Sequence, residues 1–261
     1  MSSVEGARTF GVPAAYDSFM GRYSRPLAPA FAGAAGVAAG QRVLDVGCGP
    51  GALTEELLGR VGASAVAAID PSEPFVEECA RRNPGVDVRV GAAERLPFED
   101  GSFDRALAQL VLHFVSDQAA AAGELRRVVR DGGSAAACVW DFGGGMQMLR
   151  LFWEAARTAV PSAPDEASTL RFGRDGEIGS LFREAGLRDV VTGALTVEVG
   201  YEGFEDLWRG FLAGSGPAGS LCVSLEPEPQ EALREELRRR VGDPRGPFSL
   251  TARAWYAVGR A

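Results

Sequence analysis

The chain has 261 residues, 46% of them hydrophobic and 24% charged, which is typical of a soluble globular domain. Its net charge of −8 arises from 27 basic and 35 acidic residues, and every basic residue in the sequence is arginine. An acidic chain without a basic block is unsuited to a phosphate backbone, so we expect no nucleic-acid partner.

No apolar run approaches the length of a membrane span, and residues 1–10 lack the apolar stretch of a signal peptide. The four cysteines are scattered without a C-x-x-C pair, which favours reduced thiols. With His113 as the single histidine, a zinc site of histidine and cysteine is not expected. We therefore expect a cytoplasmic protein without a metal ion, of undetermined oligomeric state.

Strand and helix patterns alternate along the first part of the chain. The expected strands are 41–46, 65–70, 86–91, a segment within 102–112, and 134–140. Between them, helices are expected at 52–60, from Ser72 to a stop at 83–85, and from Asp117 to Arg130, with a stop at 131–133. Short strands joined by helical crossovers favour a parallel sheet that is covered on both faces.

After Asp141 the alternation ends. Helices are expected around 146–160, 177–185, 204–212 and 229–240, and strands at 190–199 and 250–259. The Gly-Pro stretch 214–219 is expected to form a mobile loop.

Three glycines, Gly47, Gly49 and Gly51, alternate directly after the first strand in "VLDVGCGPG". In an open parallel sheet ligands bind beyond the carboxyl ends of the strands, and glycine allows a sharp turn and close approach there. The dinucleotide pattern G-x-G-x-x-G has its third glycine one residue later, and a phosphate-binding P-loop needs a lysine. Asp70, nineteen residues after Gly51, can accept hydrogen bonds from both hydroxyls of a ribose.

Three further motifs follow in order: "GAAERLPFEDGSFD" (91–104), "LVLHFVSD" (110–117) and "ELRRVVRDGG" (124–133). Together with 44–51 and Asp70, they resemble the class I S-adenosylmethionine-dependent methyltransferases, especially the small-molecule branch that includes the ubiquinone and menaquinone C-methyltransferases. The resemblance implies an α/β fold with a Rossmann-like, doubly wound seven-stranded sheet. That sheet would be mostly parallel, with an antiparallel last strand between the fifth and sixth, and would carry helical lid insertions.

With this resemblance we interpret 1–261 as a single methyltransferase domain. Its expected parts are an N-terminal helical cap (1–40), a cofactor-binding core (41–140), a lid insertion (141–189), and C-terminal strands (190–261) with a helical insertion (200–247).

The resemblance also implies which residues bind S-adenosylmethionine. Gly47, Gly49 and Gly51 would make room for its methionine and ribose portions. Asp45 would order the amino group or the loop from beneath, and Asp70 would bind the ribose hydroxyls.

For the adenine, Pro71 would cover one face and Ala93 would donate its backbone N–H to a ring nitrogen. The family often has Asp at the position of Ala92, where it accepts from the adenine amino group. In this chain Glu94 would take that role, or the amino group would face water.

The segment 16–28 is expected to fold over the cofactor, with the Tyr16 ring on it, Met20 nearby and Arg22 close to its carboxylate. The alternative is that Tyr16, Phe19 and Tyr23 form a packing stripe at helical spacing.

His113 is the candidate catalytic base, because imidazole titrates near neutral pH; alternatively it only lines the site. Gln109, near the end of the fourth strand, is a candidate cofactor-binding residue. Metal-dependent relatives cluster carboxylates at the ends of the fourth and fifth strands, but here only Asp141 follows the fifth. We therefore expect metal-independent transfer.

The acceptor is expected to be a small molecule with an O, N or C nucleophile. Its pocket, or else the cores of helical lids, would be formed by Phe152, Trp153, Trp208 and Phe211. Two alternatives stay open: an NAD(P)-dependent oxidoreductase of Rossmann type, and a non-catalytic module that binds S-adenosylmethionine.

Overall fold

The computed structural model describes residues 12–160, 163 and 171–261. The start of the expected cap (1–11) and part of the expected lid insertion (161–162 and 164–170) lie outside the described residues.

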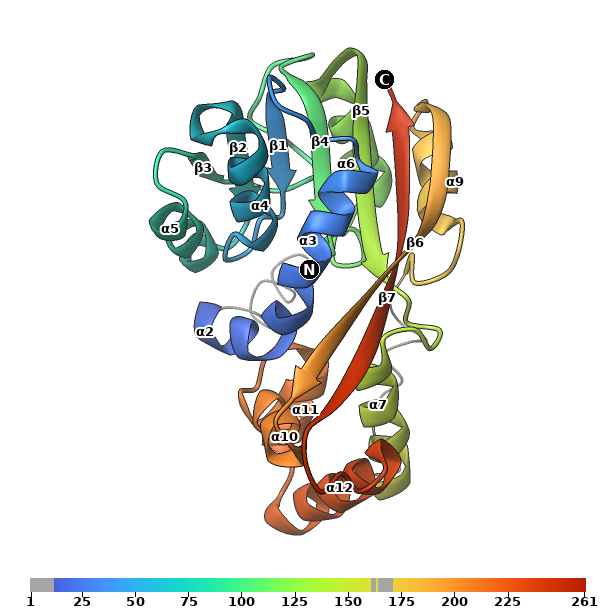
Figure 1. Ribbon diagram of the computed structural model, residues 1–261. Helices are drawn as coiled ribbons and strands as arrows, with labels where there is room; N and C mark the ends of the chain where they lie inside the picture. Colours follow the sequence, from blue (N-terminus) through green and yellow to red (C-terminus); the bar gives the residue numbers. More distant parts are fainter. Residues whose placement is uncertain (1–11, 161–162, 164–170) are drawn as a thin grey trace.

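Seven strands form one sheet in the order β3-β2-β1-β4-β5-β7-β6 (Figure 1). β7 runs antiparallel to both β5 and β6, whereas the pairs among β1 to β5 are parallel. The predicted fold class, with the last strand inserted between the fifth and the sixth, is therefore confirmed. The strands are β1 (Val43–Val46), β2 (Val66–Asp70), β3 (Asp87–Val90), β4 (Phe103–Gln109), β5 (Val129–Trp140), β6 (Arg188–Tyr201) and β7 (Phe248–Arg260).

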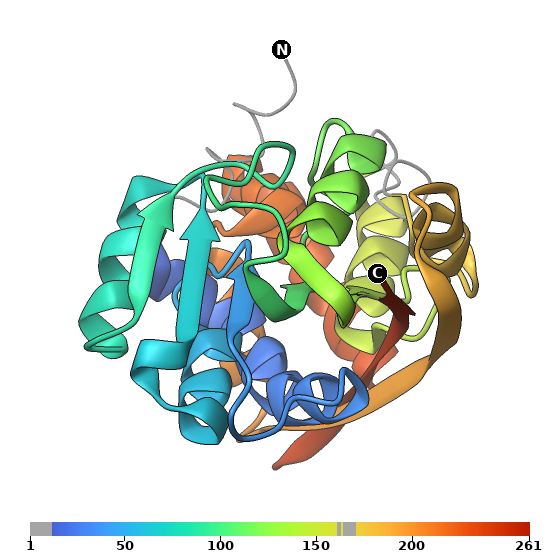
Figure 2. The same ribbon diagram turned by 90° about the horizontal axis from the view of Figure 1, so that it is seen from above.

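Two layers of helices enclose the sheet (Figure 2). On one face α3, α4 and α5 pack over the sheet; on the other, α6 packs over β4 and β5, and α9 packs over β6 and β7. The helical elements are α2 (Pro13–Tyr16), η1 (Asp17–Gly21), α3 (Arg22–Ala34), α4 (Ala52–Val61), η2 (Ala63–Ala65), α5 (Glu73–Arg82), α6 (Gln118–Val128), α7 (Gln147–Ala159), α9 (Glu177–Glu184), α10 (Phe204–Leu212), α11 (Gly216–Ser224) and α12 (Pro227–Val241).

β6 and β7 are much longer than the first strands, and they continue beyond the sheet toward α7, α10, α11 and α12 (Figure 1). These helices share one hydrophobic core with α3, so the N-terminal segment and the C-terminal helices meet. At that junction the Phe19 ring meets the Phe211 ring edge-on, with centroids 5.2 Å apart. The carboxyl ends of the central strands are therefore covered by segments from both halves of the chain.

Two predictions about local structure are wrong. The stretch 131–133 does not separate a helix from a strand, because β5 already begins at Val129 and contains it. Gly132 has a φ of +77°, and the pairing with β4 shifts register beside it, so an irregularity absorbs the glycines within the strand.

The Gly-Pro stretch 214–219 is also not a loop, because α11 begins within it at Gly216. Pro217 lies in the first turn of α11, where its missing N–H has no helical partner to lose. A Cβ on Gly219 would lie 2.8 Å from the Gly214 carbonyl carbon, so glycine here allows close packing.

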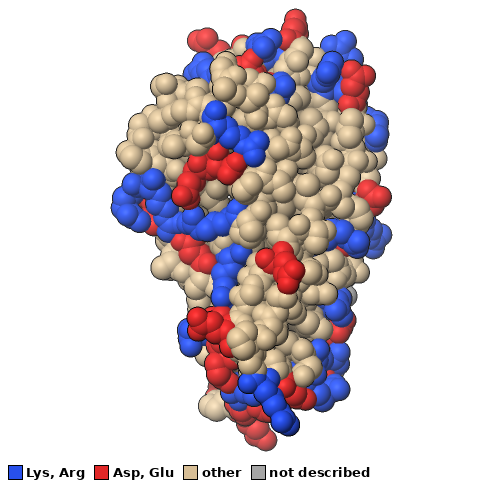
Figure 3. Space-filling view, in the orientation of Figure 1, with Lys and Arg blue, Asp and Glu red and all other residues tan. Residues whose placement is uncertain are grey.

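Charges of both signs lie side by side on the face shown in Figure 3. The Arg22 guanidinium meets the Asp206 carboxylate at 2.8 Å, and Arg25 pairs with Glu55 at the same distance. Across residues 12–160, 163 and 171–261, no helix is both long and apolar enough to cross a membrane.

Gly51 is fixed by packing at the start of α4. Its φ is +96°, and a Cβ would lie 2.5 Å from Asn83 Nδ2 and 3.1 Å from Cys79 Sγ of α5. We expect Gly51→Ala to lower the free energy of unfolding by about 2–4 kcal/mol, measured by urea denaturation, because strain and overpacking add.

Gly59→Ala is the matched control. Gly59 lies in the same helix, is exposed, and has no atom within 4 Å of the point where a Cβ would lie, so alanine should stabilise by roughly 0.5–1 kcal/mol. A Gly51→Ala variant as stable as the parent would contradict the packing account.

Candidate functional site

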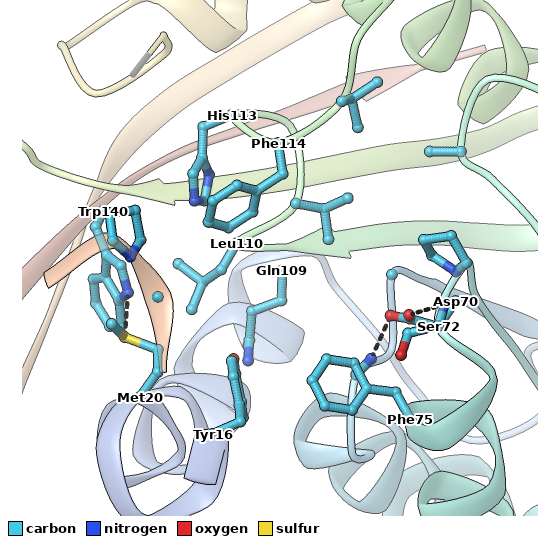
Figure 4. A pocket seen from close by; sticks show the side chains of 18 of the residues that line it. Tyr16, Met20, Asp70, Ser72, Phe75, Gln109, Leu110, His113, Phe114 and Trp140 are labelled. Carbon is cyan, nitrogen blue, oxygen red and sulfur yellow. Dashed lines mark hydrogen bonds between the residues drawn. The ribbon is translucent and has the colours of Figure 1, made fainter. Parts of the chain in front are cut away.

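A cavity of about 190 Å³ lies at the carboxyl ends of β1, β2 and β4 (Figure 4). One end, here called the glycine-turn end, is formed by Gly47, Gly49, Asp70, Pro71, Ser72, Phe75, Ala92, Ala93 and Glu94. The other, the aromatic end, is formed by Phe19, Met20, His113, Phe114, Trp140, Phe142, Leu149, Gly216, Pro217 and Ala218. Tyr16 and Gln109 lie between the two ends (Figure 4).

The glycine-turn end is organised by the Asp70 carboxylate. Its Oδ2 accepts a hydrogen bond from Gly49 N, and its Oδ1 accepts one from Ser72 N, both at 2.9 Å. Burial raises the pKa of Asp70, and the two backbone donors oppose that rise. The carboxylate thus joins the ends of β1 and β2 while it faces the cavity.

Two of the three glycines border the cavity. Gly47 has a φ of +72°, and a Cβ on it would lie 2.4 Å from Val111. Gly49 has a φ of +52°, and no protein atom lies within 4 Å of a Cβ there, so the space beside it is free for a ligand. Gly51 is not among the lining residues, and its role is the contact with α5.

Asp45 lies beneath this turn and does not line the cavity. Its Oδ2 accepts a hydrogen bond of 2.6 Å from the Thr54 hydroxyl of α4, whereas Oδ1 has no partner in the described part of the chain. Burial raises the pKa of Asp45 to about 7. Asp45 therefore ties β1 to α4 under the glycine turn.

The lining near Asp70 is mixed. Pro71 is exposed, Ala93 is buried, and Phe75 meets the Tyr16 ring edge-on at a centroid distance of 5.7 Å. Glu94 accepts hydrogen bonds from the Ser116 N–H at 3.1 Å and from the Ser116 hydroxyl at 2.9 Å. The one carboxylate near Ala92 and Ala93 is thus already engaged by the loop after β4.

At the end of β4, Gln109 lines the cavity and extends its side chain toward Tyr16 (Figure 4). Its Nε2 donates to the Ser24 carbonyl at 3.0 Å, while its buried Oε1 finds no partner among the described residues. Leu110, which follows, has a φ of +63°, an uncommon conformation for leucine that turns the chain toward His113. The Gln109 side chain therefore ties the end of β4 to α3, with its amide oxygen buried beside the cavity.

His113 is enclosed by aromatic rings. Its ring centroid lies 3.8 Å from that of Phe114 and 5.3 Å from that of Phe142. Burial alone lowers the pKa of His113 to about 3, so its imidazole is neutral at physiological pH. Its buried Nδ1 has no hydrogen-bond partner within the described ranges.

Besides His113 and Phe114 from the loop after β4, the aromatic end draws on four separate segments of the chain. Phe19 and Met20 come from η1, Trp140 from the end of β5, Leu149 from α7, and 216–218 from α11. The Trp140 indole N–H donates to the Met20 sulfur at 3.2 Å, which joins the N-terminal segment to the sheet (Figure 4).

The structure gives Arg22 a position other than the expected one. It is not among the cavity-lining residues; its guanidinium makes two hydrogen bonds to the Asp206 carboxylate of α10, at 2.8 and 3.0 Å, and lies over the Tyr201 ring. Bidentate pairing and ring stacking both suit arginine, so the sequence position alone could not distinguish this use.

Of the two alternatives for the four aromatic residues, acceptor pocket or cores of helical lids, the structure shows the second. Phe152 stacks on Phe211 with centroids 4.3 Å apart, and Trp153 and Trp208 are also buried. None of the four lines the cavity. Their helical spacing signals a buried face, and that is what they form.

Sequence reasoning missed most of the aromatic end. The sequence patterns do not distinguish Trp140 from other strand residues, Phe142 from other loop residues, or Leu149 from the other apolar residues of its helix. Only the register of each element turns these residues toward the cavity, and a single-sequence pattern does not carry that information.

Fold and site together define an α/β protein with a ligand site at the carboxyl ends of a doubly wound sheet. Residues 44–137 match the family model described as a methyltransferase domain. Residues 44–137 thus carry a methyltransferase domain, and the cofactor of the class I methyltransferases that this part resembles is S-adenosylmethionine.

Among curated relatives, a malonyl-[acyl-carrier protein] O-methyltransferase of Geobacter sulfurreducens is 33% identical over 57% of this chain and 56% of its own length. In this relative and two other curated relatives, the matched region covers between 28% and 56% of the relative's length, so the similarity spans about half of those proteins or less.

Two solved structures illustrate the fold. The YcgJ protein of Bacillus subtilis aligns with a TM-score of 0.56 and 20% identity, over 91% of this chain and 97% of its own. The [4+2]-cyclase SpnF aligns with a TM-score of 0.58 and 20% identity, over 90% of this chain and 81% of its own. The second likeness means that the fold alone does not define the reaction.

Because the chain has one histidine, proton NMR can follow His113 without assignment. We expect its ring signal not to titrate between about pH 5 and pH 8 in the folded protein, since burial lowers its pKa to about 3. A folded-state midpoint near the ordinary value of 6.5 would contradict this.

The same shift affects stability. Between about pH 3 and pH 6.5 the unfolded chain binds a proton that buried His113 does not, so the free energy of unfolding falls as pH drops through this window. His113→Gln should remove that part of the slope, as measured by urea unfolding at several pH values.

Proposed function

We propose that the protein transfers the methyl group of S-adenosylmethionine to a small-molecule acceptor without a metal ion. The observation that carries the proposal is the continuity of the cavity, which joins the glycine turn and Asp70 to an aromatic compartment. When bound, S-adenosylmethionine supplies a methyl group already activated by a sulfonium. The protein's task is then to orient donor and acceptor and to exclude water.

Asp70 is the proposed ligand of the ribose hydroxyls. Its carboxylate is held by the N–H groups of Gly49 and Ser72, so little reorganisation is needed before a ligand binds. Gly47 and Gly49 leave room beside it for the methionine and ribose portions.

The adenine is proposed to lie between Pro71 and the neighbouring lining, with Phe75 as an additional wall. Ala93 would offer its backbone N–H, and Ala92 offers no side-chain acceptor. Glu94 keeps one carboxylate oxygen, Oε2, outside its bonds to Ser116, and that oxygen could accept from the adenine amino group.

Gln109 and Tyr16 are proposed to contact the middle of the cofactor. Gln109 lines the cavity at the end of β4, between the glycine-turn end and the aromatic end. Tyr16 lines the same region, and burial raises the pKa of its hydroxyl to about 12, so the side chain stays neutral. Arg22 is left out of this proposal because it is engaged by Asp206.

Metal independence is proposed because the nearest carboxylate after β5 is occupied. Asp141 Oδ2 accepts from Arg253 Nε at 2.8 Å, and its Oδ1 accepts from Gly143 N at 2.9 Å. Freeing this carboxylate for a cation would leave the Arg253 guanidinium without its partner.

Removing the Asp70 carboxylate tests the cofactor site. We expect Asp70→Ala to raise the dissociation constant of S-adenosylhomocysteine at least about tenfold in calorimetric titration, because charge-assisted hydrogen bonds are lost. Asp87→Ala is the control, since Asp87 is exposed and, among the described residues, pairs only with Arg89 on the same strand, β3. Thermal denaturation would first verify that the Asp70→Ala and parent proteins are both folded. Equal affinity of the two folded proteins would then remove the ribose assignment.

Methyl transfer itself is tested with a labelled cofactor and a panel of phenols, amines and quinol precursors. We expect label in at least one small-molecule product, at the same rate with and without EDTA. Binding of S-adenosylhomocysteine without turnover on every acceptor would favour a non-catalytic module, and loss of turnover in EDTA would refute metal independence.

A further inference from the structure

The two ends of the cavity differ sharply in charge. Its lining contains two carboxylates, Asp70 and Glu94, and both belong to the glycine-turn end. Both are engaged by backbone N–H groups: Asp70 by Gly49 and Ser72, and Glu94 by Ser116. In the proposed complex Asp70 also binds the ribose and Glu94 Oε2 the adenine amino group, so neither lies beside a group at the aromatic end.

At the aromatic end, no described lining residue carries a charge at neutral pH. The walls are aromatic rings, thioether and aliphatic side chains, and the Gly-Pro-Ala start of α11. An ammonium or carboxylate placed there would be desolvated without a partner, which costs several kcal/mol. This compartment therefore selects against a charged acceptor.

His113 is the one titratable side chain among the described residues of the aromatic end. The groups packed around it, Phe114, Phe142 and Trp140, do not titrate. Its Nδ1 is buried and unpartnered within the described structure, although a buried polar atom usually has a partner. His113 also lines the cavity, so its imidazole is the titratable group that a ligand at this end would meet.

We propose that the acceptor is a flat, apolar molecule with a hydroxyl group and no charged substituent, and that its hydroxyl pairs with the His113 imidazole. This inference rests on the proposed methyl transfer and names the substrate class of the same cavity. The aromatic walls provide stacking and edge contacts for a planar body, and His113 provides the polar contact that orients it.

The hydroxyl also sets the chemistry. Its oxygen forms a bond to the methyl carbon, the carbon–sulfur bond breaks with its electron pair left on sulfur, and the hydroxyl proton passes to solvent. Neutral imidazole can accept from a hydroxyl or, as the other tautomer, donate to its oxyanion, so His113 orients the nucleophile in either form. His113 thus positions the acceptor oxygen and does not act as the general base of the reaction.

The acceptor class is tested with three analogues of one planar phenol: the neutral parent, one with a carboxylate and one with an ammonium group. With S-adenosylmethionine and the full chain, we expect kcat/KM for each charged analogue to be at least about 100-fold lower than for the parent phenol. Titration of the three compounds into the complex with S-adenosylhomocysteine should give the same order.

Adding a negative charge to the wall of the aromatic end tests the same selectivity in the opposite direction. Leu149→Glu should recover transfer to the ammonium analogue, and Leu149→Gln, of similar size but uncharged, should not. If Leu149→Glu fails to fold, the comparison of the three analogues with the parent protein still decides the matter.

The role of His113 is tested by its pH dependence. Across phenols of different acidity, we expect the midpoint of the pH–rate profile to follow the acceptor's own pKa. His113→Gln should retain transfer within about tenfold, while His113→Phe should raise KM further, because only the amide replaces the hydrogen bond. A midpoint fixed near neutral pH for every phenol, and lost in His113→Gln, would instead make His113 the general base.

The failures are distinguishable. If S-adenosylhomocysteine does not bind at all, the proposed function fails. If it binds, but charged analogues are methylated as well as the neutral phenol, or no neutral hydroxyl compound is bound or methylated, the acceptor class proposed here is overturned.

Discussion

The site depends on one buried carboxylate that holds two strand ends together. Asp70 closes the gap between the glycine turn after β1 and the start of α5, through Gly49 N and Ser72 N. A carboxylate is costly to bury, and the two backbone donors offset much of that cost while leaving its oxygens toward the cavity. The glycine turn can therefore keep its left-handed backbone, and the cavity has a fixed polar end before any ligand binds.

The opposite end of the cavity is held by long-range packing rather than by a local turn. Met20 receives the Trp140 N–H, and Phe19 packs on Phe211, so η1 is part of the main core. The Arg22–Asp206 pair fastens the same segment to α10. An N-terminal segment that is bound this firmly forms a fixed wall of the site.

Local signals made the sheet predictable, and the absence of local signals explains the errors. The apolar runs of the parallel strands, the cap at Asp117 and the glycine turn each depend on neighbours within a few residues. Arg22 found a partner 184 residues away, which no short pattern encodes. The stretch 214–219 contains three glycines and a proline, yet α11 begins within it, and Gly219 packs closely on Gly214. Tertiary contacts decided these cases.

The uncharged aromatic end also has a consequence for catalysis. Attack of an oxyanion on a sulfonium joins opposite charges, and both charges diminish on the way to products. Such a step is favoured in surroundings of low polarity, because the reacting charges attract more strongly there and little solvation remains to be lost. Phe142, Leu149 and Trp140 supply these surroundings, and a charged base beside the acceptor would weaken them. A buried, neutral histidine is therefore compatible with the reaction, since it orients the oxygen without adding a charge.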